Sequence, residues 1–175
     1  MQVITIAGPE FRNFDWRKLS AGCVACPFFM PMEKLQNGTW PHPARLPLGC
    51  GWGGNCTAPG HEDARLELED LHSCNLGYAD SCRRMPQIRA WDAVRFAVRA
   101  SALRAVSGSE ESAGRIELQY VCERQHRAVE HGTLEFDAVA LKWVRPHSDT
   151  RVQKMAECFL QVHLERRGGR VTEVA

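Results

Sequence analysis

The chain has 175 residues and a mass of 19.7 kDa, which fits one domain with at most a small appendage and excludes two large domains. Hydrophobic residues make up 44% and charged residues 25%, so the chain can bury a core, and disorder throughout is excluded. The formal net charge of +1 argues against an acidic tail and against a polybasic protein held on nucleic acid by counterion release.

The first half of the chain predicts little regular structure. Residues 1–7 form a short β-prone run, and residues 26–60 carry a density of Pro and Gly that we expect neither helix nor strand to tolerate. A loop of this length in a compact domain must be held in place by something other than secondary structure, and bound metal would do so. Residues 62–76 predict a helix with early acidic residues, with Leu68 and Leu71 on one face and Gly77 at its end.

The second half predicts an antiparallel sheet. Apolar residues alternate with polar ones in residues 93–99, 116–123 and 133–137, which is the period of half-buried strands. Ser148 or Asp149 can cap a helix that ends at residues 166–169. The apolar face of this helix comprises Val152, Met155, Ala156, Phe159 and His163. We therefore predict an α+β fold in which a C-terminal helix covers a three-stranded antiparallel sheet, beside a loop-rich, Cys-coordinated N-terminal half.

Cysteine content and charge both change near residue 86. Of the eight cysteines, six lie in residues 1–82, and the Lys and Arg count against Asp and Glu is 6 to 9 there and 16 to 12 afterwards. We predict a Cys-rich metal-binding region over residues 1–86 and a sheet-and-helix region over residues 87–175, packed as one compact unit.

The chain has no apolar run of about 18 residues and begins with neither the basic start nor the apolar stretch of a secretory signal. We therefore expect a cytoplasmic protein that has no contact with membranes. Cytosolic cysteines are kept reduced, so the eight cysteines predict metal ligands or redox groups rather than disulfides.

The N-terminal cysteines predict a metal site. A C-x2-C pair lets two thiolates meet one ion from a tight turn, and glycines near several of these cysteines let backbone N–H groups approach the sulfurs. Buried, unliganded thiols are the alternative for any single cysteine. The six cysteines are Cys23, Cys26, Cys50, Cys56, Cys74 and Cys82.

A [4Fe–4S] cluster or a zinc ion needs four ligands, and six cysteines are available. We favour Cys26, Cys56, Cys74 and Cys82, with Cys23 as the first substitute and Cys50 able to replace Cys56.

The remaining cysteines and three histidines are secondary candidates. Cys122 falls on the inward face of a predicted strand and Cys158 on the last helix, so we assign both to the core. His42, His61 and His72 could serve as zinc ligands, although each fits an ordinary exposed histidine better.

The apolar, proline-stiffened stretch after Cys26 favours an iron–sulfur cluster of the [4Fe–4S] type over Zn²⁺, because aromatic cover limits solvent attack on a cluster. We therefore expect a non-enzymatic iron–sulfur protein that transfers electrons or senses redox state with a protein partner. A zinc-stabilised interaction module, binding protein or nucleic acid, is the alternative. Thiol–disulfide chemistry at Cys23 and Cys26 is a third possibility, although the usual βαβ pattern is absent.

Two further groups of polar residues could be functional. Residues 123–132 place histidines and carboxylates in a predicted hairpin connection, where acid–base or metal chemistry is conceivable. Arg95 and Arg99 share one strand face and could form a basic patch for nucleic acid, but pairing with Glu117 and Glu123 across the hairpin is the simpler expectation.

Overall fold

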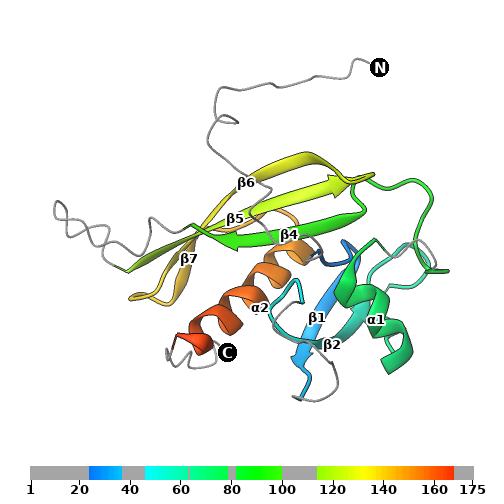
Figure 1. Cartoon of the computed structure of the whole chain (residues 1–175), viewed down its shortest axis with the longest axis horizontal. Helices are drawn as coiled ribbons and strands as arrows, with labels where there is room; N and C mark the ends of the chain where they lie inside the picture. The colour runs from blue at the N-terminus through cyan, green and yellow to red at the C-terminus, as the bar shows by residue number, and fades with distance from the viewer. Residues whose placement is uncertain (1–23, 37–45, 63, 79–81, 100–113, 168–175) are drawn as a thin grey trace.

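The computed structural model describes residues 24–36, 46–62, 64–78, 82–99 and 114–167, and within these ranges the fold is a mixture of two helices and two antiparallel sheets, neither of which closes on itself (Figure 1). The α+β class is therefore confirmed. The predicted strand at residues 1–7 lies outside the described residues. In chain order the elements are β1 (Phe29–Lys34), β2 (Trp52–Cys56), β3 (Ala64–Arg65), α1 (Leu68–Leu76), β4 (Ala93–Val98), β5 (Arg115–Arg124), β6 (Arg127–Asp137), β7 (Lys142–Arg145) and α2 (Thr150–Arg166).

The larger sheet has the order β4-β5-β6-β7. All three strands predicted for the second half are present, and Leu118 at the centre pairs with Val98 on one side and Leu134 on the other. The predicted sheet lacked β7, which pairs with β6 through Phe136 and Trp143. A four-residue strand at a sheet edge is too short to show a convincing period of two, so the sequence pattern did not reveal it.

The prediction that residues 26–60 tolerate no strand was wrong. β1 and β2 form an antiparallel pair within this segment, and β3 completes a second sheet. Pro31 is accommodated because β1 is an edge strand and the register shifts between Pro31 and Glu33, as at a bulge. Gly54 is needed where β1 and β2 approach closely, since a Cβ there would lie 2.1 Å from the Met30 carbonyl oxygen.

Helix α1 starts six residues later than predicted, because β3 occupies the first part of the expected helix. Leu71 is buried as expected, whereas Leu68 is 62% exposed. Gly77 ends the helix as predicted, with a φ of +62° that favours glycine. A Cβ at Gly77 would also lie 2.5 Å from the Val24 carbonyl oxygen, so the helix end packs directly against the chain before Cys26.

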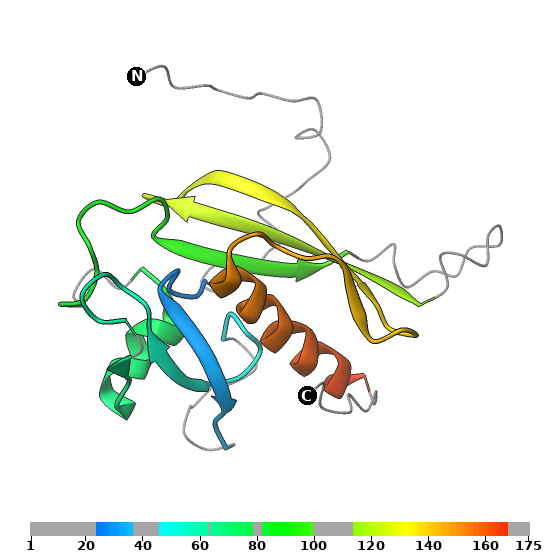
Figure 2. The same ribbon diagram turned by 180° about the vertical axis from the view of Figure 1, so that it is seen from behind.

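Helix α2 lies between the two sheets and contacts both β1 and β4 (Figure 2). The helix was predicted correctly, including its cap: the Asp149 carboxylate accepts hydrogen bonds from the backbone N–H groups of Arg151 and Val152. Because α2 packs against two sheets, its buried residues are not confined to the one predicted face, of which Phe159 and His163 are only half-buried. Its buried residues are Val152, Met155, Ala156, Cys158, Leu160 and Val162.

One hydrophobic cluster joins the two sheets and two helices, with members such as Phe29, Trp52, Leu71, Leu118 and Met155. The division at residue 86 stays a prediction. None of the helices in the described ranges is long and apolar enough to cross a membrane.

Asp149 makes stability depend on pH. Burial raises the pKa of Asp149, but hydrogen bonds from the Arg151 side chain and from two backbone N–H groups bring it below its ordinary value. The carboxylate therefore stabilises the fold above its unfolded pKa of about 3.9, and this contribution is lost as the pH falls through the folded pKa. We expect Asp149→Asn to cost about 1 kcal/mol at neutral pH, and less at acidic pH.

Urea denaturation at pH 7 and at pH 3 measures this difference. Asparagine also caps helices well, so the variant removes mainly the charge. A loss of the same size at both pH values would contradict the assignment.

Candidate metal centre

Four cysteines from separate segments line one cavity of about 470 Å³. Cys26 precedes β1 and Cys56 ends β2, and the pairing of Phe29 with Cys56 puts both at the same end of this hairpin. Cys74 lies on α1, where its carbonyl accepts the Cys26 N–H at 3.0 Å. Cys82 follows α1 in sequence. All four cysteines favoured from the sequence therefore line this cavity, and their role as ligands stays a prediction.

Cys26 is surrounded by groups that stabilise a thiolate. A hydrogen bond with the Cys74 thiol is the main cause that lowers the Cys26 pKa, and the backbone N–H groups of Phe28 and Phe29 and the charge of Arg151 lower it further against the effect of burial. The same contact with Cys26, together with burial, raises the Cys74 pKa. Backbone N–H groups directed at sulfur are the outer-shell contacts that support ligating thiolates.

Cys56 is held in a similar way. Burial raises its pKa, but the Ala58 N–H donates to its sulfur and opposes this effect. The next residue, Thr57, holds Cys56 in place. The backbone N–H and the hydroxyl of Thr57 both donate to the Phe28 carbonyl, at 2.8 Å and 2.9 Å. The loops that carry Cys26 and Cys56 are therefore bonded to each other.

An arginine lies beside the cavity next to Cys82. The Arg84 guanidinium forms a salt bridge with Asp70 on α1, with a distance of 2.8 Å between nitrogen and oxygen. Both residues line the cavity, and the charge of Arg84 lowers the pKa of Cys56 in opposition to burial. The salt bridge ties the segment after Cys82 to α1.

Within the part of the chain that the structure describes, no three His, Cys, Asp or Glu side chains are grouped so that they could hold one metal ion. Zn–S bonds are about 2.3 Å long, so two sulfurs on one zinc ion lie at most about 4.6 Å apart. An iron–sulfur cluster is larger than one ion and spans ligands that stand further apart. The Cys26 and Cys74 sulfurs are close enough for a hydrogen bond, as on a single ion, whereas all four cysteines share one cavity, as around a cluster.

The other sequence candidates fall elsewhere. Cys23 and His42 lie outside the described residues. Cys50 does not line the cavity, because it precedes β2 and lies near the charges of Lys34 and Glu165. Burial raises the pKa of its thiol to about 11.

Of the two described histidine candidates, His61 lines the cavity, whereas His72 is exposed on α1 and does not line it.

Cys122 and Cys158 are core residues, as predicted, with exposed fractions of 0% and 3%. Burial raises the pKa of both thiols, for Cys158 to about 12. Neither of them lines the cysteine cavity.

Asn75 is a site residue that the sequence analysis missed. Its exposed fraction is 1%, its amide donates to the carbonyls of Trp52 and Leu71, and its carbonyl accepts the Trp52 N–H, each at 2.9 Å. These bonds fix α1, which carries Cys74, against β2, which carries Cys56. The sequence signal that could have revealed Asn75 is its position directly after the candidate ligand Cys74.

The residues 123–132 do form a hairpin, with Gln125 and His126 in its turn at φ values of +50° and +60°. Glu130 and His131 are neighbours on β6, so their side chains point to opposite faces of the sheet. Glu130 and His131 therefore do not form an acid–base site with each other.

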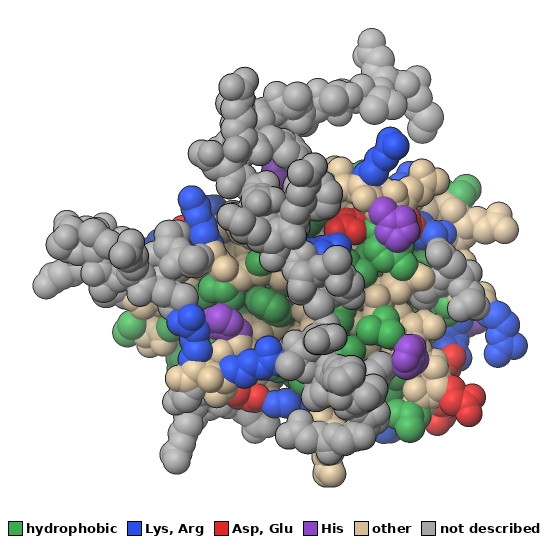
Figure 3. Space-filling view, viewed as in Figure 1, with side chains coloured by type: hydrophobic (Ala, Val, Ile, Leu, Met, Phe, Trp, Pro, Cys, Tyr) green, Lys and Arg blue, Asp and Glu red, His purple; other side chains and the backbone are tan. Residues whose placement is uncertain are grey.

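The proposed basic patch is neutralised. Arg95 pairs with Glu123 at 2.6 Å and Arg99 pairs with Glu117 at 3.2 Å, as the simpler expectation had it. The face of the molecule in Figure 3 shows acidic as well as basic side chains rather than a single basic field.

We compared the chain with family models, with curated proteins and with solved structures, and none of them matches it.

Proposed function

We propose that the chain binds a [4Fe–4S] cluster through Cys26, Cys56, Cys74 and Cys82, and that this cluster transfers electrons or senses redox state. The observation that carries the proposal is the meeting of these four cysteines, from distant parts of the sequence, around one cavity of about 470 Å³. Backbone N–H groups directed at the sulfurs of Cys26 and Cys56 support it, because they stabilise thiolate charge.

Electrostatics also favour a cationic occupant. The contact with Cys26 and burial are the main causes that raise the pKa of Cys74, and negative charge on Cys26, Cys56 and Cys82 raises it further, so free thiolates oppose one another in this cavity. Iron ions inside a cluster remove this repulsion. We infer that binding of the centre stabilises the fold of β1, β2 and α1.

The experiment is anaerobic reconstitution with iron and sulfide. We expect a brown protein with broad absorption near about 400 nm and four iron atoms per chain. A protein that stays colourless and free of iron after this treatment would refute the proposal.

A zinc-stabilised interaction module is the second candidate. It is favoured by the contact between the Cys26 and Cys74 sulfurs and by the position of His61 in the cavity wall, since one zinc ion binds closely spaced Cys and His ligands. Elemental analysis of the protein as purified distinguishes the two candidates, because this module would contain zinc and be colourless.

We further propose a cytoplasmic location and a protein partner. A second redox protein is the partner class that suits electron transfer, and the pairing of Arg95 and Arg99 with glutamates favours a protein over a nucleic acid. Co-purification under anaerobic conditions tests for this partner.

A further inference from the structure

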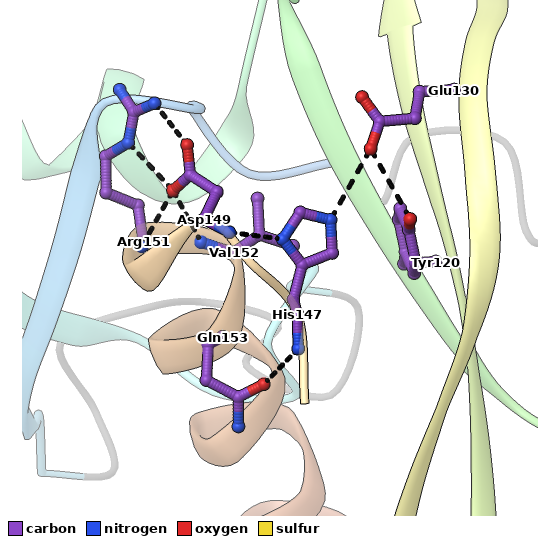
Figure 4. A network of polar contacts seen from close by, with 7 residues as sticks. All are labelled: Tyr120, Glu130, His147, Asp149, Arg151, Val152 and Gln153. Atoms are coloured by element: carbon purple, nitrogen blue, oxygen red, sulfur yellow. Dashed lines mark hydrogen bonds and ion pairs between the residues drawn. The ribbon is translucent and has the colours of Figure 1, made fainter. Parts of the chain in front are cut away.

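A chain of polar contacts runs from the larger sheet to the first turn of α2 (Figure 4). Glu130 on β6 lies with a carboxylate oxygen 3.5 Å from His147 Nε2. His147 Nδ1 accepts the backbone N–H of Asp149 at 2.9 Å. Asp149 then binds the Arg151 guanidinium through both carboxylate oxygens.

These contacts hold Arg151 in one position. The pair with Asp149 is bidentate, which fixes the plane of the guanidinium, and Asp149 is itself fixed as the cap of α2. The His147 side chain is only 5% exposed and its ring packs edge-on against Tyr120, with centroids 4.6 Å apart. A cation held in this way cannot move away to be fully solvated.

The guanidinium of Arg151 lies over the ring of a residue in the cavity wall. Its Cζ lies 5.3 Å from the centroid of the Phe28 ring, and Phe28 lines the cavity. The positive charge of Arg151 also acts on the sulfur of Cys26, two residues before Phe28. Arg151 itself does not line the cavity, so it acts on the centre through its field rather than as a ligand.

We propose that Arg151 sets the reduction potential of the centre, as a cation that the contacts from Glu130 to Asp149 hold over Phe28 in the cavity wall. The inference rests on the proposed iron–sulfur function. When the cluster accepts one electron from an external one-electron reductant, such as dithionite, its negative charge increases by one and no bond is broken. A fixed positive charge nearby stabilises this reduced state and raises the potential.

The test is a redox titration of the reconstituted full chain and of Arg151→Gln, with dithionite as the reductant. Glutamine removes the charge but keeps a polar side chain of similar reach. We expect a roughly tenfold lower equilibrium constant for one-electron reduction, which is a shift of about 59 mV to lower potential. Arg151→Lys, which keeps the charge, should recover most of the shift.

Lys154→Gln is the matched control, since Lys154 is a cation one turn further along α2 that does not line the cavity. Its potential should equal that of the wild type. An unchanged potential in Arg151→Gln, or an equal shift in Lys154→Gln, would overturn the inference while leaving the cluster in place. Loss of the cluster from Arg151→Gln would also overturn it, because Arg151 would then be needed for binding. A wild type without iron would instead refute the proposed function and the inference with it.

Discussion

Serine in place of Cys56 or Cys82 is expected to abolish the retention of iron by the reconstituted protein. Each residue supplies one of four proposed ligands, and a serine hydroxyl is a poor ligand because it does not ionise at neutral pH. Both cysteines line the cavity, and because Cys56 is also buried in the core, buried cysteines outside the cavity are needed to separate loss of a ligand from loss of packing. Iron content after gel filtration, together with visible absorption, measures the result.

Cysteines outside the cavity provide matched controls. Cys50, Cys122 and Cys158 are buried, but none of them lines the cavity. Serine at these positions should lower stability by about 1–3 kcal/mol, through burial of a hydroxyl group, and leave iron retention intact. Equal loss of iron in all the variants would indicate general unfolding and would refute the choice of ligands.

Replacing Asn75 with alanine is expected to destabilise the protein by about 3 kcal/mol. The variant leaves the N–H and the carbonyl of Trp52 buried without their side-chain partner, and each unsatisfied buried group costs about 1–3 kcal/mol. Because Asn75 fixes α1 against β2, the variant should also bind iron more weakly. Urea denaturation of the metal-free protein and iron retention give the two readouts.

Gln161→Ala serves as the control, since Gln161 makes an exposed hydrogen bond with Glu165 one turn along α2. Its stability should stay within about 0.5 kcal/mol of the wild type. A stable Asn75→Ala protein with normal iron content would show that α1 is held by other contacts.

The second half of the fold was predictable because its strands have one buried face. Leu118 and Cys122 alternate with Glu117 and Gln119 on β5, and this alternation reports burial directly. Helix α2 was predictable for a similar reason, with Asp149 as a recognisable cap. What the pattern could not show is that a second sheet covers the other side of α2.

The first half was not predictable from the same rules. Proline and glycine normally interrupt strands, yet Pro31 lies at a bulge in an edge strand, where no partner needs its missing N–H. Gly54 is required by the close approach of Met30, which depends on the pairing of two segments far apart in sequence. Such tertiary requirements are invisible in a local pattern.

The candidate site was predictable in its cysteines but not in its surroundings. The crowding of cysteines in the first 82 residues led to the four that line the cavity, and their role as ligands stays a prediction. Arg84, Asn75 and Arg151 were missed because they act through contacts between distant elements. Charge alone could not distinguish the two arginines among 22 basic residues.

The position of α2 has a consequence for cooperativity. Since both sheets pack against this one helix, neither can separate from it without exposing apolar side chains to water. Calorimetry should therefore record a single heat-absorption peak, and loading with iron should move the whole peak to higher temperature, although every proposed ligand belongs to the first 82 residues.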